Sequence, residues 1–135
     1  MPLRAWVLLA VLTACTGEKT DTASSGDTAS APTFAAVRDQ VLVPSCALGG
    51  CHSATDQNGM ALPAGGEHAA LVNVESTFAP GQFFVVPGDA DGSYLVLKME
   101  DAVGITGGAM PPPMGALDPD LKQLVRAWID AGANP

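Results

Sequence analysis

Residues 46–52, with the sequence Cys-Ala-Leu-Gly-Gly-Cys-His, decide which fold this 135-residue chain can form. Cys46 and Cys51 are separated by four residues, and His52 follows directly. A cysteine followed by a histidine is what covalent attachment of a c-type haem requires, because the thiols add to two vinyl groups while the imidazole lies under the iron. The common motif has only two residues between the cysteines, so two extra residues must loop outward here. The Gly49-Gly50 pair suits such a loop, since glycine reaches positive φ without a Cβ clash.

The same segment and a later loop supply candidate iron ligands. His52 is the expected proximal ligand, binding iron through one ring nitrogen and donating the other N–H to a backbone carbonyl. A thioether suits the sixth position of an electron carrier, because a soft neutral donor favours reduced iron. Met110 and Met114 lie in a Gly- and Pro-rich loop whose prolines fix φ and hold a side chain without a helix. Met110 is the preferred ligand and Met114 the alternative, whereas His68 is expected on a solvated helix face.

Other interpretations of these residues stay open. A Cys46–Cys51 disulfide beside an ordinary polar histidine would make a haem-free surface lipoprotein module with a binding or structural role. A haem domain that senses a gas or a redox state would need only a weakly held sixth position. A zinc site that adds His52 and His68 to the cysteines is less favoured, because adjacent Cys and His side chains converge poorly on one tetrahedral ion. No catalytic motif is recognisable in the sequence, so we do not expect an enzyme.

The first residues are typical of an exported lipoprotein. In the expected signal peptide, residues 1–14, Arg4 precedes an apolar run that is too short to span a bilayer. The sequence Leu-Thr-Ala-Cys at residues 12–15 resembles a bacterial lipobox, in which an acylated Cys15 becomes the mature N-terminus. Thr16 follows instead of aspartate, which by resemblance to Gram-negative lipoproteins favours the outer membrane. We therefore expect a protein of the bacterial cell envelope that is attached to the membrane by its N-terminal lipid.

A linker is expected at residues 15–32, which contain the sequence Asp-Thr-Ala-Ser twice and no large apolar side chain. Such a segment cannot bury enough surface to offset its ordering entropy, so it predicts a disordered, flexible tether. The whole chain has a formal net charge of −8. This charge disfavours binding of nucleic acid or anionic lipid headgroups to the protein surface and favours basic or neutral partners.

The expected globular domain, residues 33–135, has a short amphipathic helix near each end. The first begins after the N-cap Thr33 and is expected to end at Pro44. The last begins after the N-cap Asp118 and continues to Gly132. Its apolar face is formed by Leu121, Leu124, Val125, Trp128 and Ile129.

The middle of this domain is expected to be mostly loop. It contains a helical turn at residues 67–72, an apolar run at 83–86 and a short helix at about 93–99. Met60 and Met99 are expected to be core residues. Because a small domain with few aromatic side chains has a thin core, a haem would supply apolar material that the chain lacks.

These elements, in this order, resemble the small cytochrome c-like domains of bacterial lipoproteins and planctomycete-type cytochromes. The matching segments are residues 44–46, 50–53, 86–89, 93–95, 110–111 and 128–133. The resemblance implies an all-α cytochrome c fold, with short helices and long Gly/Pro-rich loops around one haem c, whose first and last helices cross near one haem edge. Cys46 and Cys51 would hold the haem, and His52 and Met110 would be the axial ligands. The implied function is one-electron transfer through transient contacts with redox partner proteins.

Overall fold

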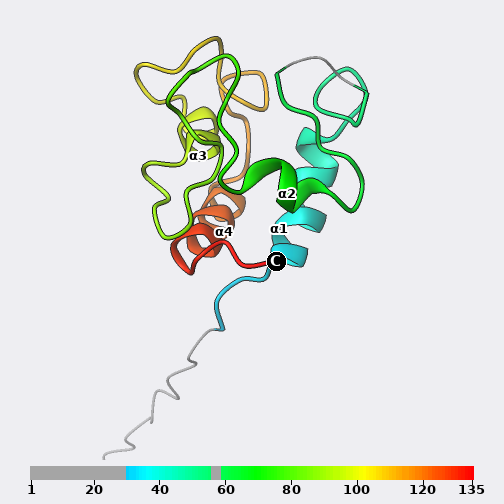
Figure 1. Ribbon diagram of the computed structural model, residues 1–135, viewed down its shortest axis with the longest axis vertical. Helices are drawn as coiled ribbons and strands as arrows, with labels where there is room; N and C mark the ends of the chain where they lie inside the picture. Colours follow the sequence, from blue (N-terminus) through cyan, green and yellow to red (C-terminus); the bar gives the residue numbers. More distant parts are fainter. Residues whose placement is uncertain (1–29, 56–58) are drawn as a thin grey trace, which may run out of the picture.

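The computed structural model describes residues 30–55 and 59–135, and within these ranges the chain is helical and contains no β-strand. Its elements are α1 (Phe34–Val37), the π-helix η1 (Arg38–Cys46), α2 (Glu67–Leu71), α3 (Tyr94–Met99) and α4 (Pro119–Asp130). Figure 1 shows α1 and α2 on one side of the molecule, α3 and α4 on the other, and long loops that connect them. The all-α class is therefore confirmed. The predicted signal peptide, Cys15 and the linker as far as residue 29 lie outside the described residues.

The first helix begins as the sequence predicts but ends later. The Thr33 hydroxyl caps α1 by accepting a hydrogen bond from the Ala36 N–H at 3.2 Å. The prediction that Pro44 ends this helix is wrong, because the chain continues as η1 to Cys46 with the proline inside it. A π-helix bonds each N–H to the carbonyl five residues earlier, and its wide turn accommodates a proline at the loss of one bond. The continuation brings Cys46 to the end of a helix that is anchored in the core.

The last helix agrees with its prediction at both ends. Asp118 accepts a hydrogen bond from the Asp120 N–H at 2.9 Å, and Pro119 occupies the first turn of α4. Beyond the helix, Gly132 has a φ of +104°, a conformation that glycine adopts without steric cost. The predicted apolar face is the buried one, with Val125, Trp128 and Ile129 inside and the two leucines packed against the core.

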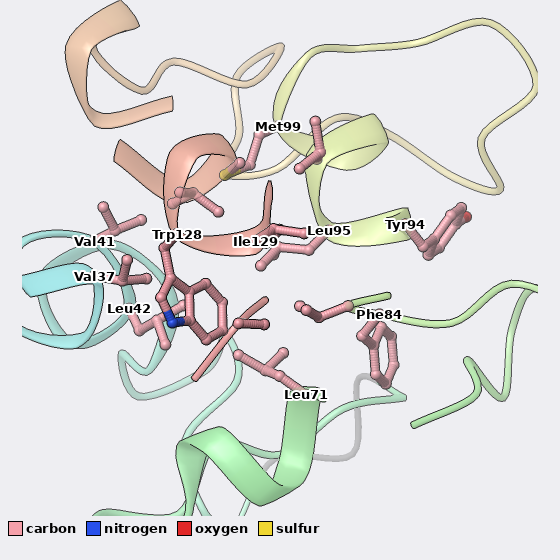
Figure 2. Packing of buried hydrophobic residues seen from close by; sticks show 14 of the residues in the cluster. Val37, Val41, Leu42, Leu71, Phe84, Tyr94, Leu95, Met99, Trp128 and Ile129 are labelled. Atoms are coloured by element: carbon pink, nitrogen blue, oxygen red, sulfur yellow. The ribbon is translucent and has the colours of Figure 1, made fainter. Parts of the chain in front are cut away.

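The hydrophobic core is centred on Trp128, which is 1% exposed. Figure 2 shows its indole directed from α4 toward Val37 and Leu42 of the first helical segment. The ring also contacts Phe34, at a centroid distance of 5.4 Å, and its Nε1–H donates to the carbonyl of Asn134 at 2.8 Å. This hydrogen bond satisfies the polar group that burial of a tryptophan otherwise strands. The first and last helices are thereby packed together.

The predicted helices α2 and α3 are both present, whereas the apolar run at residues 83–86 forms only isolated bridges. The carbonyls of Phe83 and Phe84 accept hydrogen bonds from the first residues of α3, at 2.9 and 3.0 Å. Ser93 is fully buried, and its hydroxyl receives the Val86 N–H at 2.9 Å and donates to the Asp89 carbonyl at 2.7 Å. These bonds fix α3 against the preceding loop. None of the helices within the described ranges has the length and apolar character needed to cross a bilayer.

Candidate functional site

A cavity of about 660 Å³ is lined by the end of η1, the following loop, α3 and the loop that precedes α4. Cys46, Cys51, His52 and Met110 are among its lining residues. The other walls are largely apolar and include Leu48, Met60, Phe78, Phe84, Leu95, Met99, Pro111 and Leu117. Its volume lies within the range of about 300–1,000 Å³ that is typical of pockets for small molecules and cofactors. The structure thus brings together one methionine and three residues that lie about sixty positions earlier in the sequence.

The two cysteines are half-buried neighbours in this wall. In the described part of the chain they are thiols that are not joined to each other by a disulfide. Burial, and secondly the charge of the nearby Cys51 thiolate, raises the pKa of the Cys46 thiol to about 11. An apolar surrounding disfavours the charged thiolate, which explains the direction of the shift. Cys46 therefore stays protonated at neutral pH.

The four-residue spacing is accommodated by a turn at the surface. The Cys51 N–H donates to the Leu48 carbonyl at 3.0 Å, and the His52 N–H donates to the Cys46 carbonyl at 3.1 Å. Gly49 and Gly50 are exposed in this turn, and Gly50, which also lines the cavity, has a φ of +82°. This is the outward loop that the sequence predicts, so both cysteines and the histidine remain on the cavity wall.

His52 is oriented by a hydrogen bond from its own ring. Its Nδ1 lies 3.0 Å from the Met60 carbonyl oxygen. Because a carbonyl only accepts hydrogen bonds, Nδ1 carries the proton and Nε2 carries the lone pair. The bond also fixes the ring plane, as the hydrogen bonds behind metal-bound histidines do. His52 is thus prepared to donate an electron pair from Nε2.

The structure separates the two candidate methionines. Met110 is half-buried and lines the cavity, and its N–H donates to the Lys98 carbonyl at 2.8 Å. Met114 is 79% exposed and is not part of the lining. Met99 belongs to the core, as predicted, and Met60 is packed against it. The geometry therefore favours Met110 over Met114 as the candidate ligand for a group in the cavity.

His68 does not take the position predicted for it. Instead of a solvated helix face, it is half-buried, with its Nε2 2.8 Å from the Ala133 carbonyl oxygen. Its ring contacts Phe34 and Trp128 at centroid distances of 5.0 and 6.0 Å. It therefore belongs to the core and lies outside the cavity lining. Across residues 30–55 and 59–135, no three His, Cys, Asp or Glu side chains converge as a metal site would need.

Two features of the structure were not predicted from the sequence. Lys98 is the only Lys, Arg, Asp or Glu side chain among the residues that line the cavity. Glu67 is 2% exposed, and one of its oxygens accepts a hydrogen bond from Arg38 Nε at 3.1 Å. This carboxylate raises the pKa of the Arg38 guanidinium. Arg38 and Glu67 are 29 residues apart in the sequence, so no local pattern indicates their contact.

Comparison with known proteins found no match to this chain among protein-family models, curated proteins or solved structures.

Proposed function

We propose that this protein is a single-haem c-type cytochrome that transfers one electron at a time. The observation that carries the proposal is that Cys46, Cys51, His52 and Met110 all line one largely apolar cavity. These are the residue types that attach and ligate a c-type haem, and no other function weighed for the chain requires all four together. A haem-free module needs the cysteines alone, and it gives no role to a half-buried methionine at the cavity wall.

The residues of the cavity fit such a group. The two thiols would attach the porphyrin, and the lone pair on His52 Nε2 and the Met110 sulfur would bind the iron. When bound, the haem supplies an iron that is reversibly reduced and oxidised by one electron. The protein contributes a histidine held in one tautomer by the Met60 carbonyl. It also contributes largely apolar walls, which together with the thioether would favour the reduced state.

The fold and the ends of the chain are consistent with the same proposal. An all-α chain whose first and last helices meet at Phe34 and Trp128 supports the cytochrome c resemblance. The leader and Cys15 support a lipid-anchored protein of the bacterial envelope, in the outer membrane. The net charge of −8 supports transient docking with basic or neutral redox proteins. In this proposal the protein converts no substrate and is not an enzyme.

The pair Met110→Ala and Met114→Ala tests the sixth ligand. Both variants are produced in full length with the cytochrome c maturation proteins, and their oxidised spectra are compared with that of the unmodified chain. Met110→Ala is expected to abolish the weak far-red band that marks a methionine sulfur on ferric haem iron, and to lower the reduction potential. Met114→Ala is the matched control, because its side chain is exposed and should leave the band intact.

If Met114→Ala abolished the band and Met110→Ala left it intact, Met114 would be the sixth ligand. A protein without any Soret absorption, in the unmodified chain as well, would contradict the proposal and favour the disulfide-bridged module.

A further inference from the structure

We propose that Lys98 and Tyr94 are positioning residues that clamp the methionine loop, residues 104–117, and so keep Met110 at the cavity wall. The inference rests on the proposed function, since it assigns a role in iron ligation to residues that do not touch iron. Both side chains come from α3, which is itself fixed to the core through the buried Leu95, Val96 and Met99.

Lys98 binds the loop through both its side chain and its backbone carbonyl. Its ammonium donates to the Thr106 carbonyl at 2.9 Å and also to the Gly108 carbonyl. Its own backbone carbonyl accepts the Met110 N–H at 2.8 Å. One residue thus binds the chain at three points within five residues, and the last of these points is the candidate ligand itself.

Tyr94 makes the second attachment, one helical turn before Lys98. Its hydroxyl accepts a hydrogen bond from the Thr106 N–H at 2.9 Å and lies 3.5 Å from the Thr106 carbonyl oxygen. The tyrosine is 6% exposed and lines the cavity, so packing fixes its ring independently of the hydrogen bonds that the hydroxyl makes to the loop. Thr106 is therefore bound through both its N–H and its carbonyl.

Apolar packing does little to hold this part of the loop. Residues 106–108 are exposed, and between residues 104 and 110 the only apolar side chains that pack inward are Ala109, which is buried, and Ile105, which is partly buried against the core. Hydrogen bonds that involve a charged donor are stronger than neutral ones, and here they replace the missing apolar contacts. We therefore expect the loop to open readily when the Lys98 ammonium is removed.

Opening of the loop has a measurable consequence for iron. An added ligand such as imidazole binds the sixth position only when Met110 has left it, so its apparent affinity reports the open fraction of the loop. In the oxidised, full-length, haem-loaded chain, Lys98→Met is expected to strengthen imidazole binding by about tenfold. It should also weaken the far-red band and lower the reduction potential. Methionine keeps the apolar stem of the lysine while it removes the donors.

Three further variants make the result specific. Lys122→Met on α4 removes one lysine charge at a residue that is not part of the cavity lining, and it should leave imidazole affinity unchanged. Lys98→Arg keeps charged donors and should restore most of the closed fraction. Tyr94→Phe removes only the hydroxyl and should act in the same direction as Lys98→Met, so it decides the question if Lys98→Met does not fold.

The clamp is also tested without iron, by hydrogen exchange of the Met110 amide in the haem-free full-length chain. We expect exchange to be at least about tenfold faster in Lys98→Met than in the unmodified chain. Unchanged exchange and unchanged imidazole affinity would overturn the clamp even if the protein binds haem. Accelerated exchange in a chain that never acquires haem would retain the clamp as a structural device and sink the proposed function instead.

Discussion

The two histidines occupy contrasting regions of the molecule. His68 lies in the closed core, with its ring against Phe34 and Trp128. His52 lies on the wall of the open cavity, next to two thiols. Each ring has one nitrogen within 3.0 Å of a backbone carbonyl oxygen, Met60 for His52 and Ala133 for His68.

The hydrogen bond therefore does not distinguish a ligand from a core residue. What differs is the surface that the rest of the ring faces, which is aromatic packing in one region and a cavity in the other. The core region holds the helices together. The cavity region contains the candidate ligand side chains, most of which lie on loops that the core supports. Substitutions in the two regions should consequently fail in different ways.

The largest effect is expected for His52→Ala. Without the imidazole, the chain should lose stable haem incorporation altogether, because the proposed proximal ligand and half of the Cys-His pair are gone. The measurement is the amount of covalent haem per chain, from the pyridine haemochrome spectrum and intact mass.

The matched substitution is His68→Ala, which should keep haem and lose stability instead. Equal haem content in the two variants would remove the functional distinction between the regions.

Trp128→Ala should destabilise the haem-free chain by about 3–5 kcal/mol, since it empties the centre of the core and removes the hydrogen bond to the Asn134 carbonyl. The measurement is the free energy of unfolding from urea titration. Leu48→Ala is the comparison, because Leu48 is 47% exposed at the cavity wall and should cost less than about 1 kcal/mol. Similar losses for both would mean that the cavity wall carries as much stability as the core.

Gly115→Ala tests the junction between the regions, where the methionine loop returns to the backbone of α3. Gly115 has a φ of +66°, and a Cβ there would collide with the Met99 carbonyl. We expect a loss of about 2–4 kcal/mol, because strain and overpacking add. Gly108→Ala is the control, since a Cβ at Gly108 meets nothing within 4 Å. If Gly115→Ala left the free energy of unfolding in urea unchanged, it would contradict the close approach of Gly115 to the Met99 carbonyl.

The smallest effect concerns pH and Cys46 in the reduced, haem-free chain. Burial raises the pKa of Cys46 from 9.0 to about 11, so the thiol ionises more easily after unfolding. The resulting stabilisation is complete below about pH 9 and is lost as the pH rises toward 11, by roughly 2–3 kcal/mol. Urea unfolding between pH 8 and pH 11 should show this loss in the unmodified chain and not in Cys46→Ala. A parallel loss in both would mean that other groups cause it.

Local signals in the sequence predicted much of the fold. Thr33 and the Asp118-Pro119 pair mark helix starts because capping depends only on residues within one turn. The extension of the first helix through Pro44 was not predictable in this way, since π-helical bonding leaves no simple periodic pattern. The presence of the helices could thus be predicted from the local sequence, whereas the end of the first helix could not.

The site residues were predictable only where residues adjacent in the sequence form a recognisable pair. Cys51-His52 and Met110-Pro111 could be singled out by residue type. The role of His68 could not, because its carbonyl partner, Ala133, lies 65 residues away. The contacts of Lys98 with the methionine loop likewise depend on how α3 packs, which a single sequence does not reveal.

The most direct test of the central claim is the visible spectrum and intact mass of the full-length chain, produced together with the cytochrome c maturation proteins. The account predicts a Soret band and a mass increased by one covalently bound haem. A colourless protein whose mass lacks the two thiol hydrogens of Cys46 and Cys51 would contradict it.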